Sequence, residues 1–112
     1  MITRRPGDGA GPAWRRERFE RLEREIVGEK AAALGRAGER LERAIAEVHD
    51  IAASVRRVDD PDARARLGRE YAAARERAQR ARLALLIQRE ALGLRHHAVV
   101  DQEFPEPPRE PR

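Results

Sequence analysis

Two stretches of the chain repeat apolar residues at the alternating four- and three-residue intervals of a heptad, and Asp59-Asp60-Pro61-Asp62 separates them. This spacing lines apolar side chains along one face of an α-helix and is typical of helices that pack lengthwise. The repeated positions are Val27, Leu34, Ala37, Leu41, Ala44, Val48, Ile51, Val55 and Val58 before the turn, and Leu67, Tyr71, Ala74, Ala78, Ala81, Leu85 and Leu92 after it. The pattern predicts an all-α fold, a long antiparallel helical hairpin that is coiled-coil-like in its packing.

Turn and capping residues set the limits of these elements. Asp60 is a good N-cap, Pro61 suits a first helical position because the N–H that it lacks has no partner there, and Gly93 is a natural C-cap. Pairing the helices about this turn sets Glu47 beside Arg77. The expected elements are a disordered leader at 1–13, a hairpin at 14–93 with helices at 14–57 and 62–92 and a turn at 58–61, and an extended Pro-rich tail at 94–112.

Gly28 and Gly35 lie seven residues apart inside the first helix. Glycine in a helix interior costs about 1 kcal/mol relative to alanine, so each needs a reason. One reason is the close approach of another backbone. The other is a break near Gly28, which would make three helices instead of two.

The hairpin leaves two groups of apolar residues without a partner. The first helix is longer than the second, so its N-terminal end, residues 14–27, which we call the overhang, has nothing beside it; a second apolar group points outward from the second helix. The candidate interface residues are Trp14, Phe19, Leu22, Ile26, Leu83, Leu86 and Ile87. Wide apolar surfaces belong to bundles of several helices. We therefore expect self-association into a multi-helix bundle, as a homodimer or higher homo-oligomer; the alternatives are that the tail covers the overhang or that a different protein does.

The tail, residues 94–112, combines an apolar anchor with a proline-rich stretch. Val99, Val100 and Phe104 are followed by Pro105 and three further prolines. Preformed extended segments of this kind bind with little ordering cost. These four residues are a candidate docking motif for a heterologous protein partner, and a solubilising terminus is the alternative interpretation.

Composition narrows the class of protein. Charged residues make up 39% of the chain and aromatic residues 4%, which argues for long helices and against a thick globular core. The N-terminal residues lack the apolar region of a secretory signal, and the longest uncharged apolar run, residues 83–87, is far too short to cross a membrane. A cytoplasmic protein with no membrane segment is expected.

The side chains that catalysis requires are scarce. The chain has no Cys and no Asn, and neither Ser54 nor Thr3 has a histidine and a carboxylate placed to activate it. His96 and His97 are adjacent, so their side chains diverge and do not readily share one metal ion. We expect no enzymatic activity, no cofactor, no metal site and no small-molecule substrate.

The net charge of +4 raises the question of nucleic acid. The charges alternate in sign along both helices, as on solvated faces, so the pattern does not favour a nucleic-acid surface. Arg75, Arg82 and Arg89 form a seven-residue column, whose stems we expect to cover the small flank of the first helix while the guanidinium groups stay in water. A phosphate contact is the alternative for this column.

A hairpin with Asp59, Asp60 and Asp62 at its tip resembles, in outline, the coiled-coil arm of transcription factors that enter the RNA polymerase secondary channel. Residues 70–76 are also similar to the return helix of Gre-type factors. In that family the tip acids help to hold a catalytic magnesium ion of the polymerase. The resemblance implies an alternative function, a small transcription-associated or nucleic-acid-binding factor. The globular domain that anchors such factors is missing from this sequence, and helix capping by itself accounts for acids at the tip.

Overall fold

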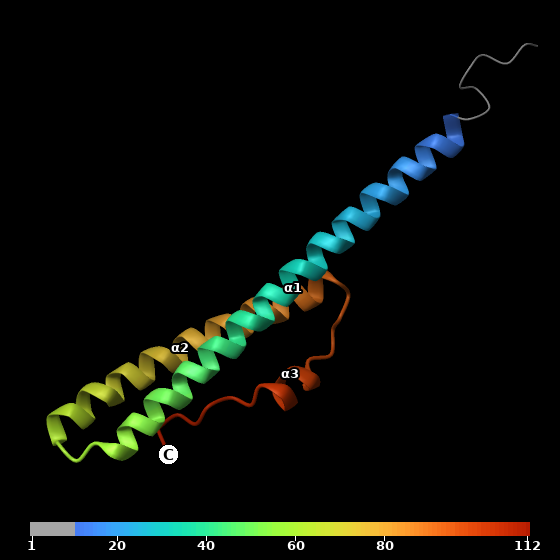
Figure 1. The fold of residues 1–112 in the computed structure, drawn as a ribbon. Helices are drawn as coiled ribbons and strands as arrows, with labels where there is room; N and C mark the ends of the chain where they lie inside the picture. The colour runs from blue at the N-terminus through green and yellow to red at the C-terminus, as the bar shows by residue number, and fades with distance from the viewer. Residues whose placement is uncertain (1–10) are drawn as a thin grey trace, which may run out of the picture.

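The computed structural model of the chain describes residues 11–112, which form three helices: α1 at Gly11–Arg57, α2 at Pro61–Ala91 and α3 at Ala98–Glu103. α1 and α2 lie side by side in opposite directions, and the tail turns back along them (Figure 1). Residues 11–112 contain no strand. The predicted all-α hairpin is therefore confirmed.

α1 is longer than the sequence pattern suggested and it is unbroken. It begins at Gly11 instead of residue 14, because Pro12 in the first turn lacks only an N–H that has no helical partner. The rest of the expected leader, residues 1–10, lies outside the described residues. α1 continues through Gly28, so the break considered there does not occur. A Cβ added at Gly28 or Gly35 would meet no atom within 4 Å, so close packing within the chain does not explain these glycines either.

The turn between α1 and α2 has the capping residues that the sequence predicts. The Asp60 carboxylate accepts a hydrogen bond from the Ala63 N–H at 2.9 Å, and Pro61 opens α2 one residue before the expected start. The predicted pair of Glu47 and Arg77 is also present, at 2.6 Å. The register of the hairpin is therefore the one that the sequence predicts.

A glycine reverses the chain at the end of α2. Gly93 has a φ of 83°, in the left-handed region that favours glycine. Its N–H donates to the Glu90 carbonyl at 2.9 Å, and the Leu94 N–H donates to the Arg89 carbonyl at 3.0 Å. These two bonds make a Schellman motif, which confirms the predicted C-cap. The tail therefore leaves α2 pointing back toward the hairpin turn.

The core has three layers, which α1, α2 and the tail contribute. Leu41, Val48 and Tyr71 are fully buried between the two long helices. Ile45 and Ala52, on the flank of the predicted seam, are buried too, whereas the seam residue Ile51 is only half-buried. The flank is buried because the tail covers it: Val100 is 4% exposed and joins the same cluster.

The prediction of an extended tail over residues 94–112 is wrong in part. Residues 98–103 form the short helix α3, and the Phe104 N–H donates to the Val100 carbonyl at 2.8 Å at its end. Residues four apart on a helix lie on one side, so α3 turns Val100 and Phe104 together toward the hairpin. Burial of this pair explains a helix too short to be stable alone.

Candidate functional site

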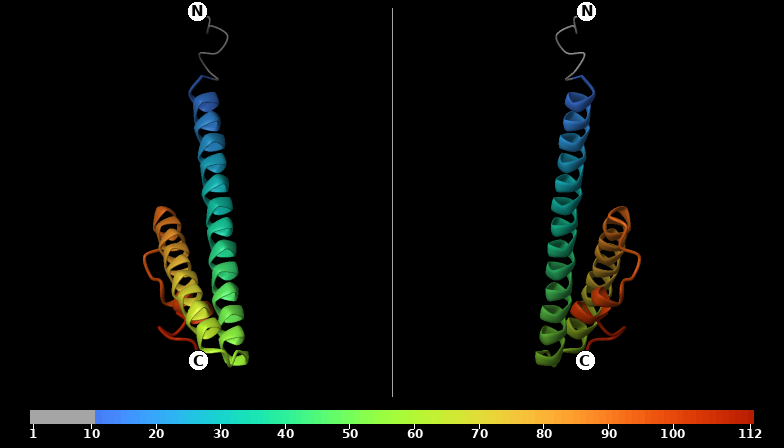
Figure 2. Two further views of the ribbon diagram at one scale, coloured as in Figure 1. Left: turned by 90° about the vertical axis from the view of Figure 1, so that its left-hand side faces the viewer. Right: turned by 90° about the vertical axis from the view of Figure 1, so that its right-hand side faces the viewer.

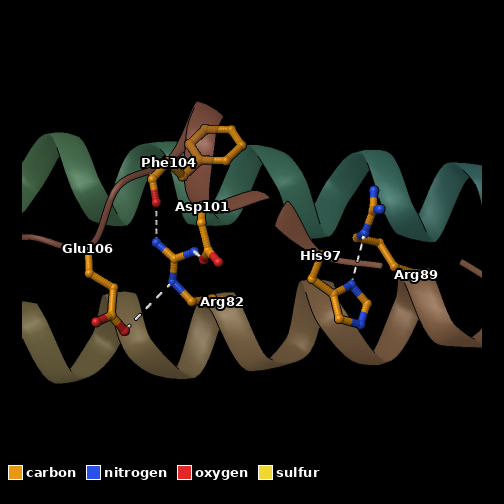
Figure 3. Close-up of polar contacts among 6 residues, drawn as sticks. All are labelled: Arg82, Arg89, His97, Asp101, Phe104 and Glu106. Atoms are coloured by element: carbon orange, nitrogen blue, oxygen red, sulfur yellow. Dashed lines mark hydrogen bonds and ion pairs between the residues drawn. The ribbon is translucent and has the colours of Figure 1, made fainter. Parts of the chain in front are cut away.

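Arg75, Arg82 and Arg89 project from one face of α2, because seven residues make almost two helical turns. We call these residues the arginine ladder. Arg89 donates to the His96 carbonyl at 2.8 Å and Arg75 to the Pro107 carbonyl at 3.1 Å. Arg82, between them, donates to the Phe104 carbonyl (Figure 3). Each arginine thus holds a main-chain carbonyl of the tail, which runs antiparallel to α2.

Arg82 is the central group of this site. Only 8% of the residue is exposed, and a buried charge is costly unless it is paired. Its guanidinium faces the carboxylates of Asp101 and Glu106 (Figure 3), at 3.1 Å and 4.0 Å respectively. The expectation that this guanidinium stays in water is wrong, because the tail covers it and supplies its acceptors.

His97 links the ladder to the start of α3. The Arg89 Nε–H donates to His97 Nδ1 at 3.3 Å (Figure 3), and His97 Nε2 lies 3.2 Å from a Glu90 carboxylate oxygen. In the tautomer that this contact requires, the ring N–H lies on Nε2 and faces the Glu90 carboxylate. His96 is exposed and contributes its carbonyl to Arg89. The two histidines thus contact Arg89 through different groups, His97 through its ring and His96 through its carbonyl.

Tyr71 holds the far end of the tail. Its hydroxyl donates to the Pro108 carbonyl, one residue beyond the carbonyl that Arg75 holds. Burial raises the pKa of the Tyr71 hydroxyl, which keeps it protonated and able to donate. Together with the arginine ladder, Tyr71 makes four side-chain contacts to carbonyls between residues 96 and 108.

The candidate docking motif of the tail divides between the hairpin and solvent. Val100 is buried and Phe104 half-buried, whereas Val99, 45% exposed, and Pro105 face solvent. Pro107, which the sequence analysis did not single out, is buried beside Ile45 and Ala78. A groove of about 230 Å³ remains open beside the anchors, and its other walls include Leu34, Gly38 and Leu85. The motif thus contacts its own hairpin and does not fill the groove.

The overhang is not covered by any described part of the chain. Its Phe19, Leu22 and Ile26 are 63%, 50% and 50% exposed, and Val27 is 57% exposed. Trp14, at 52%, has the Arg18 guanidinium 4.4 Å from its ring centre, a cation–π contact. Figure 2 shows α1 continuing past the end of α2, while the tail runs the other way. The alternative in which the tail covers the overhang is therefore wrong.

The outward group on α2 is smaller than the sequence suggested. Leu83 and Ile87 are 58% and 54% exposed. Leu86 instead packs against the core, so its assignment to an outward surface is wrong. Leu86 follows Arg82 by four residues, which places it toward the tail side of α2. The exposed patch on α2 therefore consists of Leu83 and Ile87.

Comparison with known proteins adds no identity: no family model, curated protein or solved structure matches the chain. Among the helices of residues 11–112, none has both the length and the apolar character needed to cross a membrane. In that same part of the chain, no three His, Asp or Glu side chains come together as metal ligands. Two surfaces remain as candidate sites. One is the exposed overhang, and the other is the face of α2 with the arginine ladder, where the tail lies, which we call the groove of the arginine ladder.

Proposed function

We propose that this chain is a non-enzymatic, cytoplasmic helical interaction module that self-associates through its overhang. The observation that carries the proposal is the contrast in exposure along α1: Leu41 and Val48 are fully buried, while Phe19, Leu22 and Ile26 are at least half exposed. Leaving three large apolar side chains in water forfeits the stabilisation that burial would give. A partner helix is the natural cover.

A second copy of the chain is the occupant that fits this surface best. Phe19, Leu22 and Ile26 follow the three- and four-residue spacing that places side chains on one helix face. Two such faces related by a two-fold axis are self-complementary, and an antiparallel pairing of the two overhangs would set the two hairpins at opposite ends. The result is a bundle longer than either hairpin, a scaffold that displays two tails.

The test is the mass in solution, measured by light scattering over a range of concentrations up to about 1 mM, the Kd scale of weak association. We expect the full chain to approach about twice its 12.7 kDa, the mass of a two-fold dimer. Phe19→Ser with Ile26→Ser should return it to the monomer without loss of helicity. The matched variant, Leu83→Ser with Ile87→Ser, alters an equally exposed pair on α2 and should leave the dimer intact.

Two results would contradict the proposal. The first is a full chain that stays monomeric throughout this range of concentrations, which would assign the overhang to a different protein. The second is a dimer that survives the overhang substitutions and is lost with the α2 pair, which would place the interface on α2.

The alternative, a nucleic-acid-binding or transcription-associated factor, has less support. The arginine ladder is already engaged by tail carbonyls, and the Asp60 carboxylate caps α2. Phosphate contacts make binding strongly dependent on salt, so binding of duplex DNA at low ionic strength, about 50 mM salt, is the discriminating measurement. Binding there would favour the alternative, and its absence would favour the interaction module.

A further inference from the structure

We propose that the groove along the arginine ladder is a binding site for an extended, acidic, proline-containing peptide, and that the tail is its intramolecular occupant. This site is separate from the overhang and does not depend on self-association. Its ligand class follows from what the groove holds in this structure: a segment with an apolar anchor, two carboxylates and prolines.

The groove recognises the main chain of its occupant. Side chains of Arg75, Arg82 and Arg89 donate to carbonyls, and so does Tyr71. A carbonyl is present at every residue, so these contacts do not require the side chains of this particular tail. Prolines suit the site because they offer carbonyls while carrying no N–H that would need a partner.

The charge of the groove selects acidic segments. Arg82 is buried, and its tail partners include the Asp101 and Glu106 carboxylates, both on exposed side chains at the groove edge. An occupant without a carboxylate near Arg82 would leave a buried charge poorly paired, which is costly. A ligand therefore needs an acidic residue close to its apolar anchor, as Asp101 is to Val100.

Part of the present occupant stays exposed to solvent, and part of the site beside it is open. Val100 and Pro107 are its buried side chains and Phe104 is half-buried, while Val99, Asp101 and Glu106 are exposed. The open groove of about 230 Å³ beside Phe104 leaves room for a larger anchor. The tail has one advantage over a free peptide, since its tether gives it an effective concentration in the millimolar range. A partner peptide must therefore be better matched than the tail or act when the tail is released.

The experiment uses a fluorescent synthetic peptide with the sequence of residues 98–112 and the full-length protein. Val100→Ser with Phe104→Ser in the protein removes both tail anchors without adding carboxylates beside the ladder, while circular dichroism checks that the hairpin stays helical. We expect this tail-released protein to bind the peptide at least about tenfold more tightly than the wild type, in which the tethered tail competes. A peptide carrying Asp101→Asn should bind about tenfold more weakly, since it loses the carboxylate that faces Arg82.

Arginine substitutions in the tail-released protein test the ladder itself. Arg82→Met should reduce peptide affinity at least about tenfold, the scale for loss of a charge-assisted contact. Arg80→Met is the matched control, because Arg80 is exposed on the same helix, and it should leave the affinity unchanged. A helical tail-released protein that binds no peptide, or binds it equally with and without Arg82, overturns the proposal.

A second measurement covers the case in which the tail-released protein does not fold. The same peptide, with a photoreactive benzoylphenylalanine at the position of Phe104, is added to the wild-type protein at about 1 mM, where it exchanges with the tethered tail. Crosslinks are expected to Leu34, Gly38 and Leu85, which line the open groove beside the position of Phe104. Crosslinks that fall elsewhere, or none at all, count against the site.

Discussion

The two ends of α1 carry apolar residues at similar helical spacing, yet their surroundings differ completely. Between Ala37 and Ala52 the helix is covered by α2 on one side and by the tail on another, and Leu41 and Val48 are fully buried. In the overhang the same kind of stripe is at least half exposed. Apolar spacing therefore indicates which face of a helix is able to pack, but it does not say whether anything covers that face.

The shorter length of α2 and the direction of the tail together produce this difference. The Schellman turn at Gly93 sends the chain back toward the hairpin turn, so the tail thickens a core that α2 has already begun. The overhang gains nothing from the third layer. The part of α1 that packs against α2, which we call the paired half, is buried by the fold, whereas the overhang stays exposed in the monomer.

The largest expected effect comes from truncating equivalent residues in the two regions. Leu41→Ala should lower the free energy of unfolding by about 2–5 kcal/mol, because it leaves a cavity in a fully buried site. Leu22→Ala, at a half-exposed position, should change it by no more than about 0.5 kcal/mol in the monomer. Urea unfolding followed by circular dichroism measures both, and equal losses would mean that the overhang is buried in the monomer.

The second-largest effect tests the tail, which covers the paired half of α1 but not the overhang. Arg82→Met should cost about 1.5–3 kcal/mol, the range for a hydrogen bond to a charged group, since the Phe104 carbonyl and the Asp101 carboxylate both lose their donor. Hydrogen exchange should show faster exchange of the Val100 and Phe104 amides, while the overhang is unchanged.

Arg80→Met, two residues away on an exposed face, is again the control and should leave exchange in the tail as it is. Retained protection of the Val100 amide in Arg82→Met would show that apolar contacts alone hold the tail. In that case the arginine ladder would not contribute to the difference between the paired half and the overhang, which would come from apolar packing.

Much of the hairpin could be predicted from the sequence because its signals are local. Asp60 and Gly93 act on backbone groups within five residues, and the Glu47–Arg77 register follows from counting away from a well-defined turn. The path of the tail is a tertiary property. It depends on contacts between residues far apart in the chain, such as those of the Arg82 guanidinium with Asp101 and Phe104, which neither periodicity nor propensity encodes.

One signal for the tail site was nevertheless present in the sequence. Arg75, Arg82 and Arg89 were visible as a column beside a small apolar flank, and the tail carries Asp101 and Glu106. Sequence alone predicts solvated guanidinium groups for this column, because exposed arginines are the rule and buried ones the exception. Leu86 differs from its predicted outward position for the same reason, because the side of α2 that it occupies packs against the core.

A smaller effect concerns the glycines of α1. Gly28→Ala, next to the overhang, and Gly35→Ala, near the start of the paired half, should each stabilise the helix by up to about 1 kcal/mol, because the added methyl meets open space. On the helix, Gly28 lies on the side opposite Leu22 and Ile26, so the gain should not weaken self-association. Thermal unfolding and solution mass check the two statements. A Gly28→Ala protein that loses its dimer would show that a partner backbone packs on that side instead.

The smallest effect belongs to the ion pair that fixes the register of the paired half. Glu47 and Arg77 lie 2.6 Å apart with nearly half of each side chain exposed, so a double-mutant cycle with Glu47→Gln and Arg77→Met should give a coupling of about 0.2–1 kcal/mol. The coupling should fall as salt is added, because exposed charges are screened. Glu39 and Arg43, four residues apart on α1 at 3.5 Å, are the control pair and bind no second helix to the first. A Glu47–Arg77 coupling no larger than that of the control would mean that the apolar layers alone hold the register. The ion pairs on the surface of the paired half would then add no stability that is specific to helix pairing.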